Sequence, residues 1–95
     1  MNEYAIERRL AQGVRAAGGL CLKFTSPGTP GVPDRIVITA DGRVIFIELK
    51  TEIGRLASIQ RWMIEELQKR GADVRVLKGK QAVDDFLKEV MPHEV

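Results

Sequence analysis

The 95-residue sequence contains one cysteine, one histidine and only 5% aromatic residues. Cys21 alone cannot form an intrachain disulfide, and no cluster of cysteine and histidine offers a zinc site. Because the only histidine, His93, lies close to the C-terminal residue, we do not expect catalysis by histidine. The composition therefore excludes a disulfide scaffold and a zinc-stabilised fold.

Long apolar runs and low-complexity segments are also missing from the sequence. The unbroken apolar stretches are only a few residues long, so we expect no segment that spans a membrane. The first residues, Met1 to Tyr4, are polar and acidic and lack the pattern of a signal peptide. We therefore expect a soluble protein of a reducing compartment, with a single domain over residues 1–95, because a chain this short can bury only one core.

The net charge is too small to identify a partner. Fifteen lysines and arginines against thirteen acidic residues give +2 at pH 7, which by itself does not predict nucleic-acid binding. The distribution is more informative, because basic residues run through the chain as far as Lys80 while acidic residues gather near its end. If a divalent metal covered three of the acidic side chains, the remaining surface would be clearly basic.

Hydrophobic periodicity and turn residues predict seven elements of secondary structure in the order α-β-β-β-α-β-α. Ser58 is a plausible N-cap for the second helix, and Pro92 is expected to stop the third. Segments rich in glycine, proline or polar residues predict loops over 25–33 and 51–57. The predicted elements are a helix over 3–17, strands over 20–24, 34–39 and 44–50, a helix over 58–70, a strand over 73–77 and a helix over 81–90.

The connections between these elements predict a mixed sheet. Asp41-Gly42 between two apolar runs is a strong signal for a hairpin, which makes the strands over 34–39 and 44–50 antiparallel. A helical crossover then joins the strand over 44–50 to a parallel neighbour over 73–77. The expected fold class is α/β, with helices packed on the sheet.

Two charged residues stand at the end of an otherwise apolar strand. Glu48 and Lys50 are two positions apart, so both side chains lie on the same face, while Leu49 points to the opposite layer. A carboxylate beside the apolar residues of this strand is costly unless a positive group compensates it. A divalent metal would supply that compensation, and Lys50 alone could also do so.

Asp34 precedes the neighbouring strand of the hairpin. Counting from the turn, it pairs near Glu48 or Leu49, so two carboxylates and one amine are expected to converge at one sheet edge. Hard divalent ions such as Mg²⁺ prefer oxygen sites of this kind. With a lysine beside it, such a site provides what phosphodiester hydrolysis needs.

Two helices are expected to extend this site. Gln60 starts the inward-facing stripe of the second helix, so its amide is expected to reach toward Glu48 and Lys50. In the first helix, Glu7 and Glu3 lie beside the apolar stripe, and either could add a carboxylate.

These motifs, taken in order, resemble the PD-(D/E)XK nuclease superfamily and, within it, the VRR-NUC group. They are the GVPD sequence of residues 31–34, the ELK sequence of residues 48–50, and Gln60. The resemblance covers nearly the whole chain. It implies a restriction-endonuclease-like core with a mixed β-sheet flanked by helices.

The resemblance also implies roles for particular residues. Asp34, Glu48 and Glu7 would bind Mg²⁺ or Mn²⁺, Lys50 would act in catalysis, and Gln60 would support the site. The first-helix glutamate of the family matches Glu7 better than Glu3. All five, Asp34, Glu48, Lys50, Gln60 and Glu7, are thus candidate catalytic residues.

Small stand-alone members of the group resemble Holliday-junction resolvases, which implies a homodimer that cuts DNA, branched DNA in particular. We accordingly expect a divalent-metal-dependent endonuclease, cytoplasmic in a bacterial or phage-infected cell, with no membrane partner and no small-molecule cofactor. A DNA-binding or assembly module that keeps the fold but lacks turnover is the alternative, and an RNA nuclease is not excluded.

The sequence leaves two alternative roles open for several other residues. Lys23 could contact a DNA phosphate or extend its apolar stem along the sheet toward solvent. Arg55 and Arg61 could contact DNA phosphates or serve only as solubilising charge. Arg35 follows Asp34 and should point to the opposite face, which favours a surface or dimer role over catalysis. Trp62 lies opposite the apolar stripe of its helix, which favours a dimer interface over packing under the C-terminal segment.

Overall fold

The computed structural model describes residues 1–91, and the expectations for Pro92 and His93 lie outside that range. Its elements follow the predicted order α-β-β-β-α-β-α. The helices are α1 (Glu3–Ala16), α2 (Ser58–Lys69) and α3 (Gly79–Val90), and the strands are β1 (Leu20–Lys23), β2 (Arg35–Ile38), β3 (Val44–Lys50) and β4 (Asp73–Lys78). No helix within this range is both long and apolar enough to cross a membrane.

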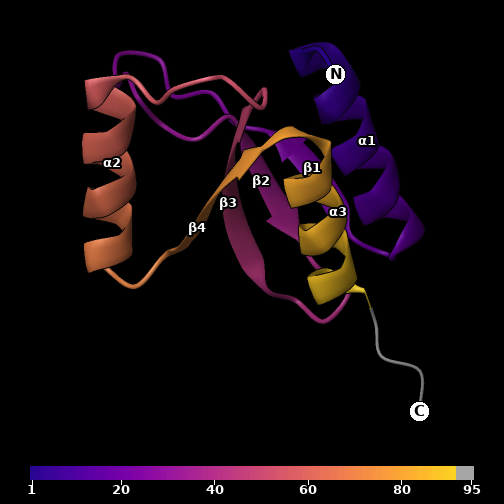
Figure 1. Ribbon diagram of the computed structural model, residues 1–95. Helices are drawn as coiled ribbons and strands as arrows, with labels where there is room; N and C mark the ends of the chain where they lie inside the picture. Colours follow the sequence, from indigo (N-terminus) through magenta and orange to yellow (C-terminus); the bar gives the residue numbers. More distant parts are fainter. Residues whose placement is uncertain (92–95) are drawn as a thin grey trace.

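The four described strands form one mixed sheet in the order β1-β2-β3-β4. The β1/β2 and β2/β3 pairs are antiparallel, and β3/β4 is parallel across the α2 crossover, which confirms the predicted topology. Figure 1 shows α1 and α3 together on one side of the sheet and α2 on the other. The expected α/β fold class is therefore confirmed.

The core lies between the sheet and the helix pair α1/α3. Alternate residues of β3 point into it, because successive strand residues face opposite sides. The same alternation sends Phe46, Glu48 and Lys50 to the α2 side. The fully buried side chains that fill the core include Ile6, Leu10, Val14, Val37, Ile45, Ile47, Leu49 and Val83.

The β2–β3 hairpin closes on the predicted Asp-Gly turn. Gly42 adopts a left-handed backbone with φ of 88°, and its N–H donates to the carbonyl of Thr39 at 2.9 Å. The Thr39 hydroxyl donates to the Asp41 carboxylate and accepts the N–H of Arg43, which fixes the turn. Since the turn sets the register, it also decides which residue lies beside Glu48.

The ends of two helices differ from the sequence prediction. Ala57, not Ser58, is the N-cap of α2, and its side chain cannot accept a hydrogen bond. The Gln60 side chain at position N3 accepts the Ala57 N–H at 2.9 Å, which is the contact that an N3 glutamine makes in a capping box. Helix α3 begins at Gly79, two residues earlier than predicted. There the Glu52 side chain accepts the N–H of Lys80 at 3.3 Å, which stabilises the first turn.

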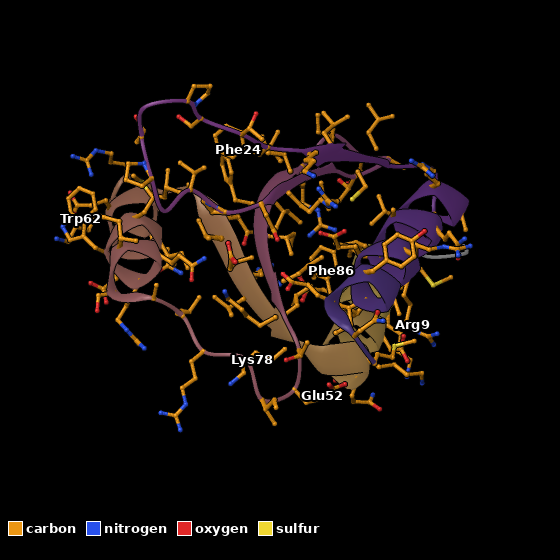
Figure 2. The ribbon with its side chains drawn as sticks, turned by 90° about the horizontal axis from the view of Figure 1, so that it is seen from above. Arg9, Phe24, Glu52, Trp62, Lys78 and Phe86 are labelled. Carbon is orange, nitrogen blue, oxygen red and sulfur yellow. The ribbon has the colours of Figure 1, made fainter. Side chains whose placement is uncertain are left out.

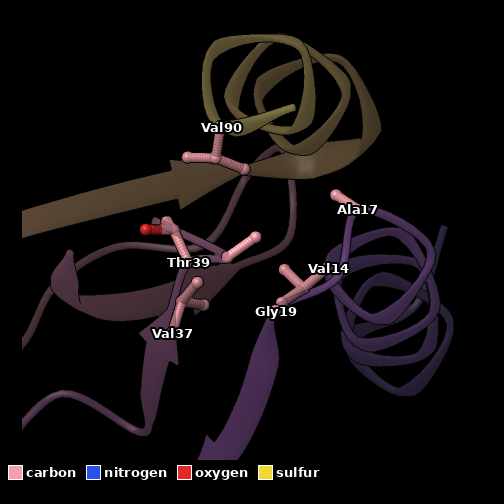
Figure 3. A pocket seen from close by; sticks show the side chains of 7 residues that line it. Val14, Ala17, Gly19, Val37, Thr39 and Val90 are labelled. Atoms are coloured by element: carbon pink, nitrogen blue, oxygen red, sulfur yellow. The ribbon is translucent and has the colours of Figure 1, made fainter. Parts of the chain in front are cut away.

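A narrow pocket between the ends of α1 and α3 and strand β2 leaves no room for a water molecule (Figure 3). Gly19 permits this close approach, because a Cβ there would lie 2.7 Å from the carbonyl oxygen of Ile38. The pocket is lined by Val14, Ala17, Gly19, Val37, Thr39, Ala40 and Val90, which are mostly apolar. It therefore reflects helix packing and not a ligand site.

The α2 side of the sheet is only partly covered. Leu20, Leu22 and Val44 remain about half exposed there, in the rows formed by β1, β2 and β3. Helix α2 packs against β4, at the opposite edge of the sheet. The covered part of this face is where the candidate site lies.

Candidate active site

Glu48 is the centre of the candidate site. Its flanking residues Ile47 and Leu49 are fully buried in the core, so the glutamate side chain points to the α2 side, where it is only 4% exposed. Lys50 Nζ lies 3.5 Å from Glu48 Oε2, and Gln60 Nε2 donates to the same oxygen at 3.3 Å. The sheet and α2 thus bring together three polar groups that the sequence predicted to meet.

Asp34 lies beside Glu48, as the hairpin count predicted. Arg35 pairs with Ile47, so Asp34, one position earlier, falls opposite Glu48. Its Oδ1 accepts the backbone N–H of Leu49 at 3.3 Å. Pro33, which is fully buried, holds the chain where it enters β2 and so fixes the position of this carboxylate.

Burial makes both carboxylates harder to ionise. Burial raises the pKa of Glu48 to about 7, and the neighbouring Asp34 adds to the rise, while Lys50 opposes it. Burial likewise raises the pKa of Asp34, against the N–H of Leu49 and the charge of Arg35. Carboxyl groups with raised pKa values that converge at the ends of two neighbouring strands are typical of functional sites.

Gln60 has two partners that fix its amide. Its oxygen accepts the Ala57 N–H, so its nitrogen is left to donate to Glu48. One side chain therefore both begins α2 and connects that helix to the carboxylate. The expected inward direction of Gln60 is found in the structure.

Glu7 lies close enough to Asp34 to raise its pKa, but its own ion-pair partner is Arg35. Its Oε1 is 3.0 Å from the guanidinium of Arg35, whose side chain is only 12% exposed. Arg35 does point to the face opposite Asp34, but it is not an open surface charge, because its largely covered side chain pairs with Glu7 of α1. Its predicted dimer role stays a prediction. Within residues 1–91 no group of three or more aspartate, glutamate, histidine or cysteine residues is close enough to hold a metal, so Glu7 stays a predicted ligand and Glu3 its alternative.

Gly31 of the GVPD segment brings the 25–33 loop against α2. It has φ of 89°, and a Cβ built there would lie 2.7 Å from the carbonyl oxygen of Ile59. This contact places the loop that carries Asp34 against the first turn of α2, which carries Gln60. The glycine thus links two parts of the site that are far apart in the sequence.

Replacing Gly31 by alanine is expected to destabilise the protein by about 2–4 kcal/mol, because left-handed strain and overpacking against a backbone atom add. Gly28 is a matched control, since it has φ of 80° but open space around its Cβ position. Gly28→Ala should cost only about 1–2 kcal/mol from the strain alone. Urea unfolding of both variants checks this, and equal losses would show that the contact with Ile59 contributes nothing.

Two contributors to the site carry no clear sequence signal. The Leu49 N–H that binds Asp34 is a backbone group, and only the strand register reveals it. The Arg35–Glu7 ion pair joins residues 28 positions apart, and only the packing of α1 on the sheet brings them together. Lys23, Arg55 and Arg61 form no ion pair within the described part of the chain, and their predicted phosphate contacts stay predictions.

Comparison with known proteins identifies the family and supports the fold. The model of the VRR-NUC domain family matches residues 4–81. A solved structure described as a VRR_NUC domain is 31% identical, with a TM-score of 0.85 over 90% of this chain and 94% of that one. A second, described as a VRR_NUC domain protein, is 17% identical with a TM-score of 0.75 over 96% of this chain and 88% of its own, and it supports the fold alone.

A curated relative also matches part of the chain. "Putative nuclease p44" of Acyrthosiphon pisum secondary endosymbiont phage 1 is 48% identical over 50 residues, which cover 53% of this chain and 54% of that protein. The match thus spans about half the length of the phage protein. The family match and the 31% identical structure each extend over most of the chain, and the chain therefore belongs to the VRR-NUC family of nuclease domains.

Proposed function

We propose that this protein is a divalent-metal-dependent endonuclease that hydrolyses DNA phosphodiester bonds. The observation that carries the proposal is the convergence of Asp34, Glu48, Lys50 and Gln60 on the α2 side of the sheet. Two mutually repelling carboxylates beside one lysine, with Glu48 buried and Asp34 partly buried, are poorly compensated without a further cation. Membership of the VRR-NUC family supports the same conclusion.

The residues present fit Mg²⁺ or Mn²⁺. Asp34 and Glu48 supply hard oxygen donors, and Mg²⁺ is commonly held by one or two carboxylates together with waters and substrate phosphates. Within residues 1–91, Asp34 Oδ1 and Glu48 Oε2 accept hydrogen bonds, which leaves one oxygen of each carboxylate for an ion. When bound, the ion would polarise a phosphate oxygen and favour ionisation of a water.

The protein's own groups would act on the substrate around these carboxylates. Lys50, with its amine 3.5 Å from Glu48, is placed to stabilise negative charge that develops on the phosphate or to orient the attacking water. Gln60 holds Glu48 in one orientation through its amide nitrogen. No residue of the site is placed as a covalent nucleophile, so we propose direct attack by water.

A cleavage assay tests this function and separates it from that of a non-catalytic module. The wild type should cut DNA with Mg²⁺ or Mn²⁺, and Lys50→Ala should lose cleavage while it still binds metal. We further propose a preference for branched DNA, because two sites on a two-fold axis suit a two-fold substrate. Four-way junctions should be cut faster than flaps or plain duplex. Equal cleavage rates on all three substrates would exclude the preference for branched DNA. Metal binding with no cleavage of any of the substrates would favour the non-catalytic module.

We also propose that the protein forms a homodimer through Trp62. The indole is 53% exposed and borders a pocket of about 260 Å³ lined by Trp62, Met63, Glu66, Leu67 and Arg70. An aromatic side chain beside an apolar pocket suits an isologous contact.

Sedimentation should give a dimer for the wild type, a monomer for Trp62→Ser, and a dimer for Leu22→Ser on the open sheet face. A dimeric Trp62→Ser together with a monomeric Leu22→Ser would place the interface on the open sheet face. A monomeric wild type would exclude the homodimer.

A further inference from the structure

The basic residues that lack an ion pair are concentrated around the candidate active site. Within residues 1–91, eight of the fifteen lysines and arginines pair with a carboxylate, which leaves seven unpaired. Four of these seven lie at strand ends or in the segments that border Asp34 and Glu48. They are Lys23, Arg55, Arg61 and Lys78.

Lys78 has the closest structural relation to the site. It is the last residue of β4, and the parallel register pairs it directly with Lys50, two positions after Glu48 pairs with Val76. Leu77 and Leu49 point together into the core, so Lys78 and Lys50 both face the α2 side. Neighbouring strands are about 4.8 Å apart, which makes the two lysines adjacent on the surface that holds the carboxylates.

The carboxylate of Glu52, at the start of α3, is already engaged by other groups. Glu52 packs against Gly79, where a Cβ would lie 2.5 Å from its Cγ, and it accepts the N–H of Lys80. Its other oxygen is 3.9 Å from the N-terminal amine. Figure 2 shows Lys78 and Glu52 on the same side of the molecule, by the loop that follows β3. Glu52 is directed to α3, and the exposed Lys78 amine forms no ion pair within residues 1–91, so it is open to a ligand.

We propose that Lys78 binds the DNA phosphate next to the one that is cut, an inference that rests on the proposed nuclease function. Lys50 is only 18% exposed and pairs with Glu48, which suits a role at the scissile phosphate. Lys78 is exposed and has no ion-pair partner in the described part of the chain, which suits a contact with a flanking phosphate, where a hydrated point charge is sufficient. Lys78 is thus a substrate-positioning residue that sets the register of the strand over Glu48 and Lys50.

The test compares Lys78→Ala with Lys88→Ala. Lys88 is also exposed and forms no ion pair among the described residues, and it lies on α3 away from the site. Binding of fluorescent junction and duplex DNA is measured by anisotropy in Ca²⁺ between 50 and 200 mM salt, and cleavage in Mg²⁺. For Lys78→Ala we expect Kd and KM to rise about 3–10-fold with kcat unchanged. The slope of the logarithm of the association constant against the logarithm of the salt concentration should become less steep by about 0.9. Lys78→Arg should restore both values, and Lys88→Ala should match the wild type.

The possible results separate the two proposals. If the wild type cuts DNA but Lys78→Ala keeps the wild-type Kd, KM and salt slope, the role of Lys78 is wrong while the nuclease function stands. A fall in kcat with unchanged KM and salt slope also overturns it. If the wild type neither binds nor cuts DNA, the proposed function itself fails. Thermal melts of all variants, with Lys78→Gln as a second neutral replacement, identify any loss that comes from unfolding.

Discussion

Glu48→Gln is expected to reduce metal-dependent DNA cleavage by about 1000-fold, because the substitution removes a charge that no other group at the site replaces. Glutamine keeps the size of the side chain and can still accept the Gln60 amide, so the fold should be retained. Single-turnover cleavage in Mg²⁺ measures the rate, and calorimetric titration with Mn²⁺ measures the binding of the ion. Binding should be lost together with cleavage.

Two variants give this experiment its controls. Glu65→Gln removes an exposed carboxylate from α2 and should leave cleavage unchanged. Glu7→Gln tests the predicted third ligand: since Glu7 pairs with Arg35, it must exchange that partner for the ion, and its removal should cost less than that of Glu48. If Glu48→Gln cut DNA at the wild-type rate, the assignment of the active site would be wrong.

The metal-free protein is expected to lose stability as the pH rises from about 5 to 8. Glu48 has an ordinary pKa of 4.5 and a folded-state pKa of about 7, so between these values the folded state holds more protons than the unfolded state. Stability that is fully present below pH 4.5 is therefore lost as the pH rises through 7. The loss amounts to about 3 kcal/mol, from about 1.4 kcal/mol for each unit of pKa difference.

Comparison with Glu48→Gln isolates this effect from the other carboxylates. Ion pairs and hydrogen bonds lower the pKa of several surface groups, Asp84 and Glu89 among them, but both proteins share these contributions. The free energy of unfolding, measured in urea with EDTA, should therefore favour the glutamine variant increasingly above pH 5. Adding Mg²⁺ at pH 8 should stabilise only the wild type. A constant difference between pH 5 and 8 would mean that Glu48 titrates normally.

The sequence predicted most of the fold because strong local signals agree with one another. The alternation in residues 44–50 and the Asp41-Gly42 turn determined the hairpin, and the hairpin count placed Asp34 beside Glu48. The starts of α2 and α3 differ from the prediction. The Gln60 amide oxygen accepts an N–H at the start of α2, and Glu52, from the loop after β3, accepts one at the start of α3. Such caps depend on side chains that only packing brings into reach.

The family motifs, the element order and the pairing of Asp34 with Glu48 could all be predicted from the sequence, because strand periodicity and turn chemistry are local. The contacts of Glu7 with Arg35, of Gly31 with α2 and of Lys78 with its neighbour Lys50 became visible in the folded chain alone. These contacts depend on how α1 and α2 pack and on the parallel register across the crossover. These contacts join residues far apart along the chain, so no short segment of the sequence predicts them.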